Sequence, residues 1–150
     1  EKWLMNSGDR IKTFVEGGGN FVVTYTTAGR SGIELPTPLP LIIGRDRVTE
    51  EEAPITLSKH PILSSPNEIT ASDFDFWVQE RGLYFPKSFE GYSEVLTIME
   101  STGTNYSNST VVGHYGKGSV IYTGLSLFRE LPAGVPGAMK LLQNILHYDH

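Results

Sequence analysis

Residues 112–126 read VGHYGKGSVIYTGLS, and this stretch indicates the fold more directly than any other. Two runs suited to β-strands flank the turn Tyr115-Gly116-Lys117-Gly118, whose glycines permit positive φ. The second run, residues 119–123, is rich in β-branched and aromatic residues, as strands are. Gly124-Leu125-Ser126 then leaves the sheet. Ligands of open α/β sheets bind beyond the carboxyl ends of strands, so this loop is a predicted ligand site.

Towards the N-terminus, the pattern is that of a helix followed by a strand. Apolar residues recur at helical spacing between Trp3 and Val15, and Gly17-Gly18-Gly19 ends the predicted helix. The apolar run 21–26 is typical of a buried parallel strand. Helix, glycines and strand form the second half of a βαβ unit whose first strand is missing. We therefore expect residues 1–150 to be one partial α/β domain, truncated at its N-terminus, with strand 21–26 exposing an open sheet edge.

The middle of the chain gives weaker signals. Residues 28–40 predict a loop, residues 55–57 and 94–100 predict strands, and residues 103–109 predict a polar loop. Thr70 with Asp73 three residues later predicts the start of a short helix through Val78. Leu41-Ile42-Ile43 is too short to assign. Apolar residues between Ala138 and Leu146 mark a C-terminal amphipathic helix.

Composition excludes several classes of function. The formal charge is −5 and the basic residues are scattered, so we expect no nucleic-acid partner. No apolar segment approaches the roughly 20 residues that span a bilayer, so we expect no membrane partner. The absence of cysteine excludes disulfides and thiolate chemistry, and leaves the cellular compartment open. The histidines do not pair at metal-ligand spacing, so we predict no metal and no cofactor.

The densest functional signal is WVQERGLYF at residues 77–85, which joins large aromatics to an amide and an ion-pair couple. Such sets line ligand clefts, because aromatic faces supply area and polar tips supply direction. The tentative binding residues are His60, Glu80, Arg81, Tyr84 and Ser126. We expect Tyr84 to stack on a sugar, with Arg81 as donor or as the partner of Glu80. The alternative is that an Arg81–Glu80 pair merely pins a loop to the core.

Catalytic patterns are not found. Gly113-x-x-Gly116-Lys117-Gly118-Ser119 is not a phosphate loop, because a strand follows it where a helix is required. No G-x-S-x-G elbow surrounds Ser126. We therefore predict no catalytic residues. A hydrolase that uses Glu80 or Asp73 with His60 is the alternative.

A string of motifs resembles a known family. The segments WVQERGLYF (77–85), YGKG (115–118), YTGLS (122–126) and FRELPAGVPG (128–137), together with RDRVT (45–49) and His60-Pro61, resemble the C-terminal region of large bacterial PIG-L/LmbE-type deacetylases. That region is similar to class I glutamine amidotransferase-like domains, which have a flavodoxin-like sheet. The resemblance thus implies a flavodoxin-like α/β fold with a parallel or mixed sheet and flanking helices.

The resemblance does not bring an activity with it. The zinc-dependent deacetylase site of that family lies in a separate N-terminal domain, and the amidotransferase reaction needs a cysteine that is absent here. It implies a non-catalytic accessory domain whose partners are the deacetylase domain of the parent chain and carbohydrate. It also implies a bacterial protein, for which a periplasmic or secreted location is one expectation. An assembly-only domain, forming a homo-oligomer through the open sheet edge, is the remaining alternative.

Overall fold

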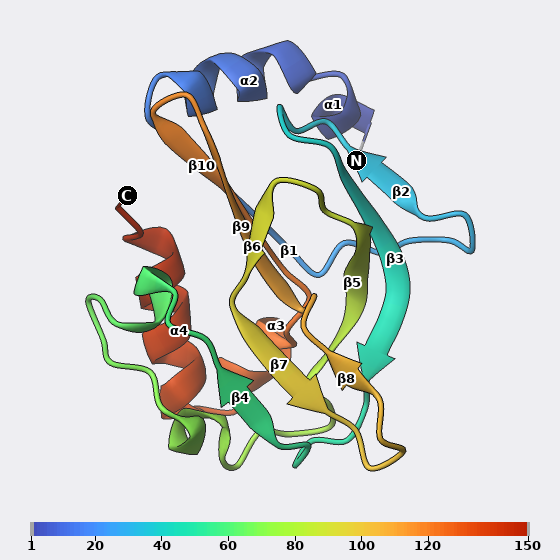
Figure 1. Ribbon diagram of the computed structural model, residues 1–150, viewed down its shortest axis with the longest axis vertical. Coiled ribbons are helices and arrows are strands. Elements are labelled where there is room, and N and C mark those ends of the chain that lie inside the picture. Colours follow the sequence, from blue (N-terminus) through green and yellow to red (C-terminus); the bar gives the residue numbers. More distant parts are fainter. Residues whose placement is uncertain (1, 150) are drawn as a thin grey trace.

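The computed structural model describes residues 2–149, which form a mixed α/β arrangement of three small sheets with flanking helices (Figure 1). The helices are α1 (Lys2–Met5), α2 (Gly8–Glu16), η1 (Pro61–Leu63), η2 (Ala71–Phe74), α3 (Leu127–Glu130) and α4 (Pro136–Leu146), where η denotes a 3₁₀ turn. The strands are β1 (Asn20–Thr24), β2 (Ile33–Leu35), β3 (Leu41–Val48), β4 (Ile55–Leu57), β5 (Gly82–Ser88), β6 (Tyr92–Glu94), β7 (Leu96–Met99), β8 (Asn105–Tyr106), β9 (Thr110–Tyr115) and β10 (Gly118–Thr123). Within the described residues, no helix is long and apolar enough to cross a membrane.

The central sheet has the strand order β1-β10-β9-β6. β10 pairs with β9 as the predicted antiparallel hairpin, and β1 lies parallel to β10 with Thr24 opposite Thr123. Gly116 takes φ +58° in the turn, as the sequence predicted. Gly118 serves a different need, since a Cβ there would lie 2.3 Å from the carbonyl oxygens of Val15 and Gly19. The hairpin can therefore pack tightly under the end of α2.

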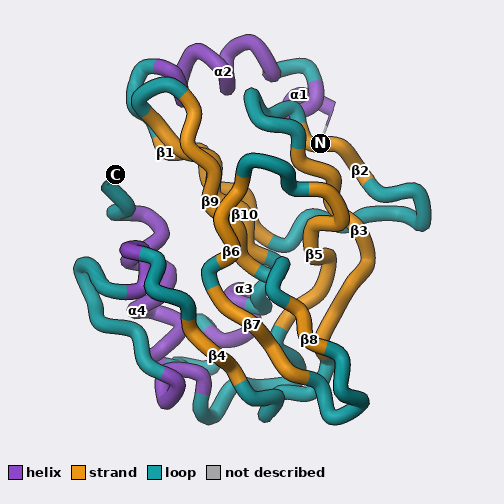
Figure 2. Tube along the Cα trace, in the orientation of Figure 1, coloured by secondary structure: helices purple, strands orange, loops and turns teal. Residues whose placement is uncertain are grey.

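Two further sheets, β2-β3-β5 and β4-β7-β8, are wholly antiparallel. Figure 2 shows these strands beside the central sheet, with α1 and α2 at one end of the molecule and α4 along one side. The largest apolar cluster lies between the central sheet, η1, η2 and α4, and a second lies between β3 and β10. Ile11 and Val15 of α2 cover Val120 of β10 in a third. β10 is thus covered by core packing on both of its faces.

The predicted helix before Gly17, the strand near residues 21–26, the strand at 55–57 and the C-terminal helix are confirmed, within a few residues at each end. The loop expectations were wrong in part: residues 28–40 contain β2 and residues 103–109 contain β8. Leu41-Ile42-Ile43 begins an eight-residue strand that continues through the charged residues 45–47. The helix after Thr70 is a single 3₁₀ turn that ends at Phe74. Pairing with β5 makes charged residues extend β3, a tertiary effect that periodicity does not contain.

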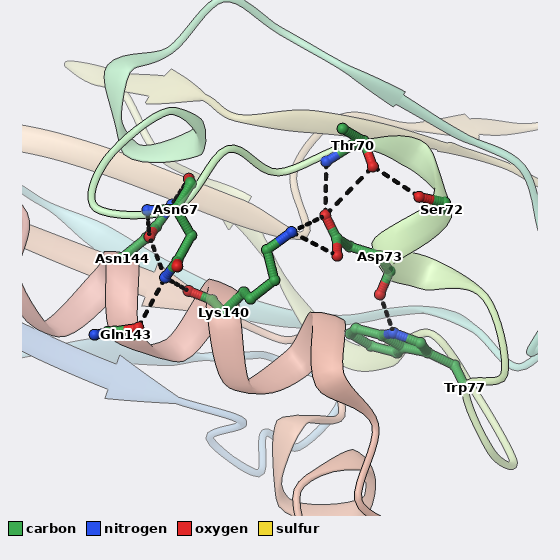
Figure 3. Close-up of polar contacts among 8 residues, drawn as sticks. All are labelled: Asn67, Thr70, Ser72, Asp73, Trp77, Lys140, Gln143 and Asn144. Carbon is green, nitrogen blue, oxygen red and sulfur yellow. Dashed lines mark hydrogen bonds and ion pairs between the residues drawn. The ribbon is translucent and has the colours of Figure 1, made fainter.

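A polar cluster fastens η2 to α4, and we call Asn67, Asp73, Trp77, Lys140 and Asn144 the α4 clasp (Figure 3). Lys140 Nζ lies 2.9 Å from both carboxylate oxygens of Asp73, and the Trp77 indole donates to the Asp73 carbonyl oxygen. The Asn144 amide donates to the carbonyl oxygens of Ile62 and Asn67 and accepts from the Asn67 backbone N–H. The predicted capping role of Asp73 is confirmed, because its carboxylate accepts from the Thr70 N–H.

Candidate functional site

The carboxyl ends of β1 and β10 lie side by side, because the two strands are parallel and in register. A cavity of about 330 Å³ opens there, lined by Thr24, Tyr25, Leu125, Leu127 and Phe128. This is the edge at which the sequence placed a ligand site, beyond the Gly124-Leu125-Ser126 loop. Its volume is at the lower end of the range of small-molecule sites. Its walls are aliphatic and aromatic, so apolar surface dominates what a ligand would meet.

Two lining residues, Tyr25 and Phe128, are in contact with a third aromatic ring and with an ion pair, and we call Tyr25, Glu80, Tyr84, Phe128 and Arg129 the aromatic rim. The Tyr25 ring meets Tyr84 edge-on at 5.4 Å between centroids and Phe128 at 4.5 Å. Arg129 lies over the Phe128 ring, 4.8 Å from its centroid. Phe128 remains about half exposed. Such a surface offers flat apolar area beside fixed polar groups.

Glu80 connects the polar groups of the rim. Its Oε1 accepts a hydrogen bond from the Tyr25 hydroxyl at 2.9 Å and another from Arg129 Nε at 3.0 Å. Burial, together with the hydrogen bond to Glu80, raises the pKa of Tyr25 to about 12, so the phenol stays protonated and donates at neutral pH. The same carboxylate raises the pKa of Arg129 through its hydrogen bond. The rim thus presents a neutral phenol and a partly exposed guanidinium whose charge Glu80 balances.

Two of the four non-glycine residues with positive φ among the described residues belong to the rim. Tyr25 and Tyr84 adopt φ of +48° and +58°, in the left-handed region that bulky side chains rarely occupy. Such residues cost on the order of 1–3 kcal/mol each and persist only where the surroundings impose them. The Tyr122 hydroxyl contributes to this, since it donates to the Tyr84 carbonyl oxygen at 2.6 Å and accepts from the Thr26 N–H. With these backbone conformations, the Tyr25 and Tyr84 rings lie in contact with each other.

Arg81 lies apart from the rim, and the expected pairing with Glu80 is wrong. Arg81 is only 4% exposed, and its guanidinium donates to the carbonyl oxygens of Ala53 and Phe74. It also lies over the Phe74 and Trp77 rings, at 5.9 and 5.7 Å. Burial lowers the pKa of Arg81, against the attraction of nearby carboxylates. Glu80 and Arg81 are successive residues, and their side chains point in opposite directions. Arg129, and not Arg81, therefore pairs with Glu80.

Ser126 lies under the rim with its hydroxyl already engaged. It is fully buried, donates to the Glu130 carboxylate at 2.6 Å and lies 2.9 Å from the Glu80 carbonyl oxygen. The equally buried Glu130 also accepts from the Val78 N–H at 2.5 Å. Ser126 and Glu130 thus fix the segment that carries Glu80. Ser126 is a support of the candidate site and does not face a ligand.

His60 belongs to another part of the molecule. Its ring lies 5.6 Å from that of Tyr148, whose hydroxyl is 2.8 Å from His114 Nε2. His114 is opposite Ser119, at the far end of β10 from the cavity. Burial, and to a lesser extent His114, lowers the pKa of His60. The sequence did not reveal that His60 lies away from the other predicted site residues, because its distance from Tyr84 depends on the packing of α4.

A larger hollow of about 650 Å³ lies elsewhere, between residues 50–54 and 99–101. Four of its eight lining residues are glutamates, and one of them, Glu50, is already bound to the Ser101 backbone N–H and hydroxyl. Across residues 2–149, no group of three or more histidine, aspartate or glutamate side chains is placed to hold a metal ion. We prefer the smaller cavity as the candidate site, since it joins apolar walls, convergent polar groups and backbone strain at a sheet edge suited to ligands.

The sequence missed three rim residues. Tyr25 ends a strand, and Phe128 and Arg129 follow the predicted ligand loop directly. Their positions just past two strand ends were the signal that could have identified them. The arrangement can bind a small polar–apolar ligand: rings pack on its apolar face, while Arg129 donates to its oxygens. Of the five predicted site residues, the structure brings Glu80 and Tyr84 to the rim, with Ser126 beneath them.

Comparison with known proteins identifies no family. No protein-family model matches the chain, and no curated protein matches it. Among solved structures, the chain is similar to the crystal structure of a beta-galactosidase from Rahnella sp. R3, with a TM-score of 0.48 and 21% sequence identity. The similarity covers 79% of this chain and 18% of the beta-galactosidase chain. This chain therefore spans less than a fifth of that enzyme.

Proposed function

We propose that this chain is a non-catalytic accessory domain of a PIG-L/LmbE-type N-acetyl-sugar deacetylase, and that it binds carbohydrate at the aromatic rim. The observation that carries the proposal is the cavity at the ends of the only parallel strand pair among the described strands, walled by Tyr25 and Phe128. Aromatic faces pack on the C–H side of a sugar ring, and a guanidinium such as Arg129 donates to hydroxyl or acetamido oxygens.

A flavodoxin-like, amidotransferase-like fold is part of the same proposal. The unit α2–β1 next to a parallel β10 supports it, because helix–strand units beside parallel strands are the building blocks of doubly wound folds. The antiparallel β9 and β6 would then be additions at one side of such a sheet. The deacetylase domain of a parent chain is the proposed partner.

Titration of the protein with N-acetylglucosamine, followed by two-dimensional NMR, tests the binding proposal. We expect a Kd on the order of 1 mM, about −4 kcal/mol, and shifts confined to residues next to the cavity. Phe128→Ala should weaken binding several-fold, because it removes one wall. Phe76→Ala is the matched control, since Phe76 is also an exposed aromatic residue but lies outside the rim. Shifts that spread elsewhere, or equal binding by both variants, would contradict the proposal.

The hydrolase alternative receives less support from the geometry. Among the described residues, Glu80 is bound to Tyr25 and Arg129, while Asp73 is bound to Lys140 and Thr70. No hydrogen bond joins either carboxylate to His60. An assay of the purified chain on acylated and glycosidic amino-sugar substrates would detect turnover directly. Activity that is lost in Glu80→Gln would favour the hydrolase over the accessory domain.

A further inference from the structure

β1 leaves one row of backbone groups without a strand partner. The Tyr25 N–H donates to the Thr123 carbonyl oxygen, and the Ser119 N–H donates to the Gly19 carbonyl oxygen. Residues with odd numbers from Gly19 to Tyr25 thus turn their backbone groups towards β10. Backbone groups alternate along a strand, so those of Asn20, Val22 and Thr24 point away from β10. Within residues 2–149 the only strand beside β1 is β10, and this row is therefore an open edge.

An exposed apolar stripe lies on α4, the helix whose end meets the start of this edge. Met139 and Leu146 are 49% and 58% exposed, and Leu142 lies between them, half-buried. The three share one side of the helix, opposite the side on which Lys140 and Asn144 form the α4 clasp. The Asn20 side chain donates to the Tyr148 carbonyl oxygen, which places the end of α4 beside the start of β1. Edge and stripe therefore form one face, the β1–α4 face.

The composition of the β1–α4 face indicates what can cover it. Its six residues, Asn20, Val22, Thr24, Met139, Leu142 and Leu146, carry no charge, although the whole chain has a formal charge of −5. Two copies can meet through this face without bringing like charges into contact. An open edge is also self-complementary, because a two-fold axis makes two identical edges pair antiparallel.

We propose that the β1–α4 face binds a second copy of this chain. The β1 strands pair antiparallel about a two-fold axis at Val22, where the two valines exchange N–H to carbonyl bonds, and Asn20 lies opposite Thr24 of the partner. The two four-stranded sheets then become one continuous sheet. Both α4 helices lie on the same face of that sheet, and their apolar stripes face each other across the axis. This interface includes Thr24, which also lines the cavity, but pairing of the two β1 strands does not require a bound sugar.

Sedimentation equilibrium of the chain over a concentration series, combined with amide hydrogen exchange, tests this interface. We expect a monomer–dimer equilibrium. The double variant Met139→Lys/Leu146→Lys should raise its dissociation constant about tenfold or more, since lysines placed at a sheet edge oppose association. Phe76→Lys is the matched control, because Phe76 is 90% exposed and lies outside the β1–α4 face. It should leave the equilibrium unchanged.

Hydrogen exchange contains its own control. The amides of Val22 and Thr24 should gain protection as the wild-type concentration rises, whereas those of Phe21 and Val23 should be protected at every concentration. A chain that stays monomeric throughout the series would overturn the proposal. So would a dimer that tolerates both lysines, or exchange at Val22 and Thr24 that does not change with concentration. A partner that adds a strand from another protein would leave this chain monomeric on its own.

Discussion

The α4 clasp and the aromatic rim are built from the same kinds of residues, and they differ in what surrounds them. Each has an ion pair and aromatic rings: Lys140–Asp73 with Trp77 in the clasp, and Arg129–Glu80 with Tyr25 in the rim. In the clasp, the polar groups bind backbone and close an internal joint. In the rim, Phe128 is half exposed and a cavity lies beside it. The two clusters therefore differ in whether a cavity and an exposed aromatic ring lie beside them, and not in the types of residue that they contain.

The motif WVQERGLYF shows this difference within nine residues. Trp77 and Arg81 turn inward and bind carbonyl oxygens of the core, whereas Glu80 and Tyr84 turn to the rim. One segment therefore supplies both regions. Trp77 and Arg81 thus pin the segment to the core, through carbonyl oxygens and not through the expected Arg81–Glu80 pair. Glu80 pairs with Arg129 instead.

The largest effect is expected at the helix that the clasp fastens. A Cβ on Gly137 would lie 1.7 Å from the Asp73 carbonyl oxygen, so Gly137→Ala must push α4 away from η2. We expect a loss of about 3 kcal/mol in the free energy of unfolding, as in severe overpacking. Denaturant unfolding measures it. Gly29→Ala is the control, because Gly29 has open space around it and should change stability by less than about 0.5 kcal/mol.

Removing the central amide of the clasp should cost somewhat less. Asn144→Ala leaves the carbonyl oxygens of Ile62 and Asn67 and the Asn67 N–H without their partner. Buried groups without partners cost about 1–3 kcal/mol, so we expect a loss of about 2 kcal/mol in thermal or denaturant unfolding. Gln143→Ala on the same helix is the control, since it removes only one exposed hydrogen bond, which the Asn67 side chain donates. If both variants lose the same stability, the clasp is not the structural joint described here.

The rim should tolerate truncation better than the clasp. Tyr84 is half-buried, so Tyr84→Ala should cost about 1–2 kcal/mol, below the roughly 3–5 kcal/mol of a fully buried aromatic residue. The same variant should weaken N-acetylglucosamine binding while the protein remains folded, as circular dichroism would show. A loss of several kcal/mol would make Tyr84 a core residue and erase the contrast with the clasp.

The smallest effect concerns the pH dependence of the ion pair in the clasp. Burial opposes ionisation of Asp73, but hydrogen bonds from the Thr70 N–H and from Lys140 outweigh it and lower the pKa of Asp73. Because the folded-state pKa lies below the unfolded value of about 3.9, the contribution of Asp73 is fully present above that pH and disappears as the pH falls through the folded-state pKa. Asp73→Asn should cost about 1 kcal/mol at neutral pH and less in acid. Urea unfolding at several pH values measures this, and a cost independent of pH would contradict it.

Periodicity and turn chemistry predicted the elements that depend on local sequence. The hairpin around Gly116, the helices before Gly17 and after Pro136, and the cap at Thr70 all follow from contacts within a few residues. β2 and β8 were missed, because these short strands exist only through pairing with β3 and β7. The charged end of β3 was missed for the same reason. Local propensity is weak wherever a partner strand supplies the stabilisation.

The sequence by itself determined the helix and strand near the N-terminus, the hairpin around Gly116, the C-terminal helix, the absence of thiol chemistry, and a loop directly after β10. Those features depend on composition, on side-chain periodicity and on the φ that glycine permits. Only the tertiary structure decided that Arg129 and not Arg81 pairs with Glu80, that Ser126 is buried, and that His60 lies near Tyr148. The physical reason is that these outcomes depend on distances between segments far apart in the chain, and packing of the whole core fixes those distances.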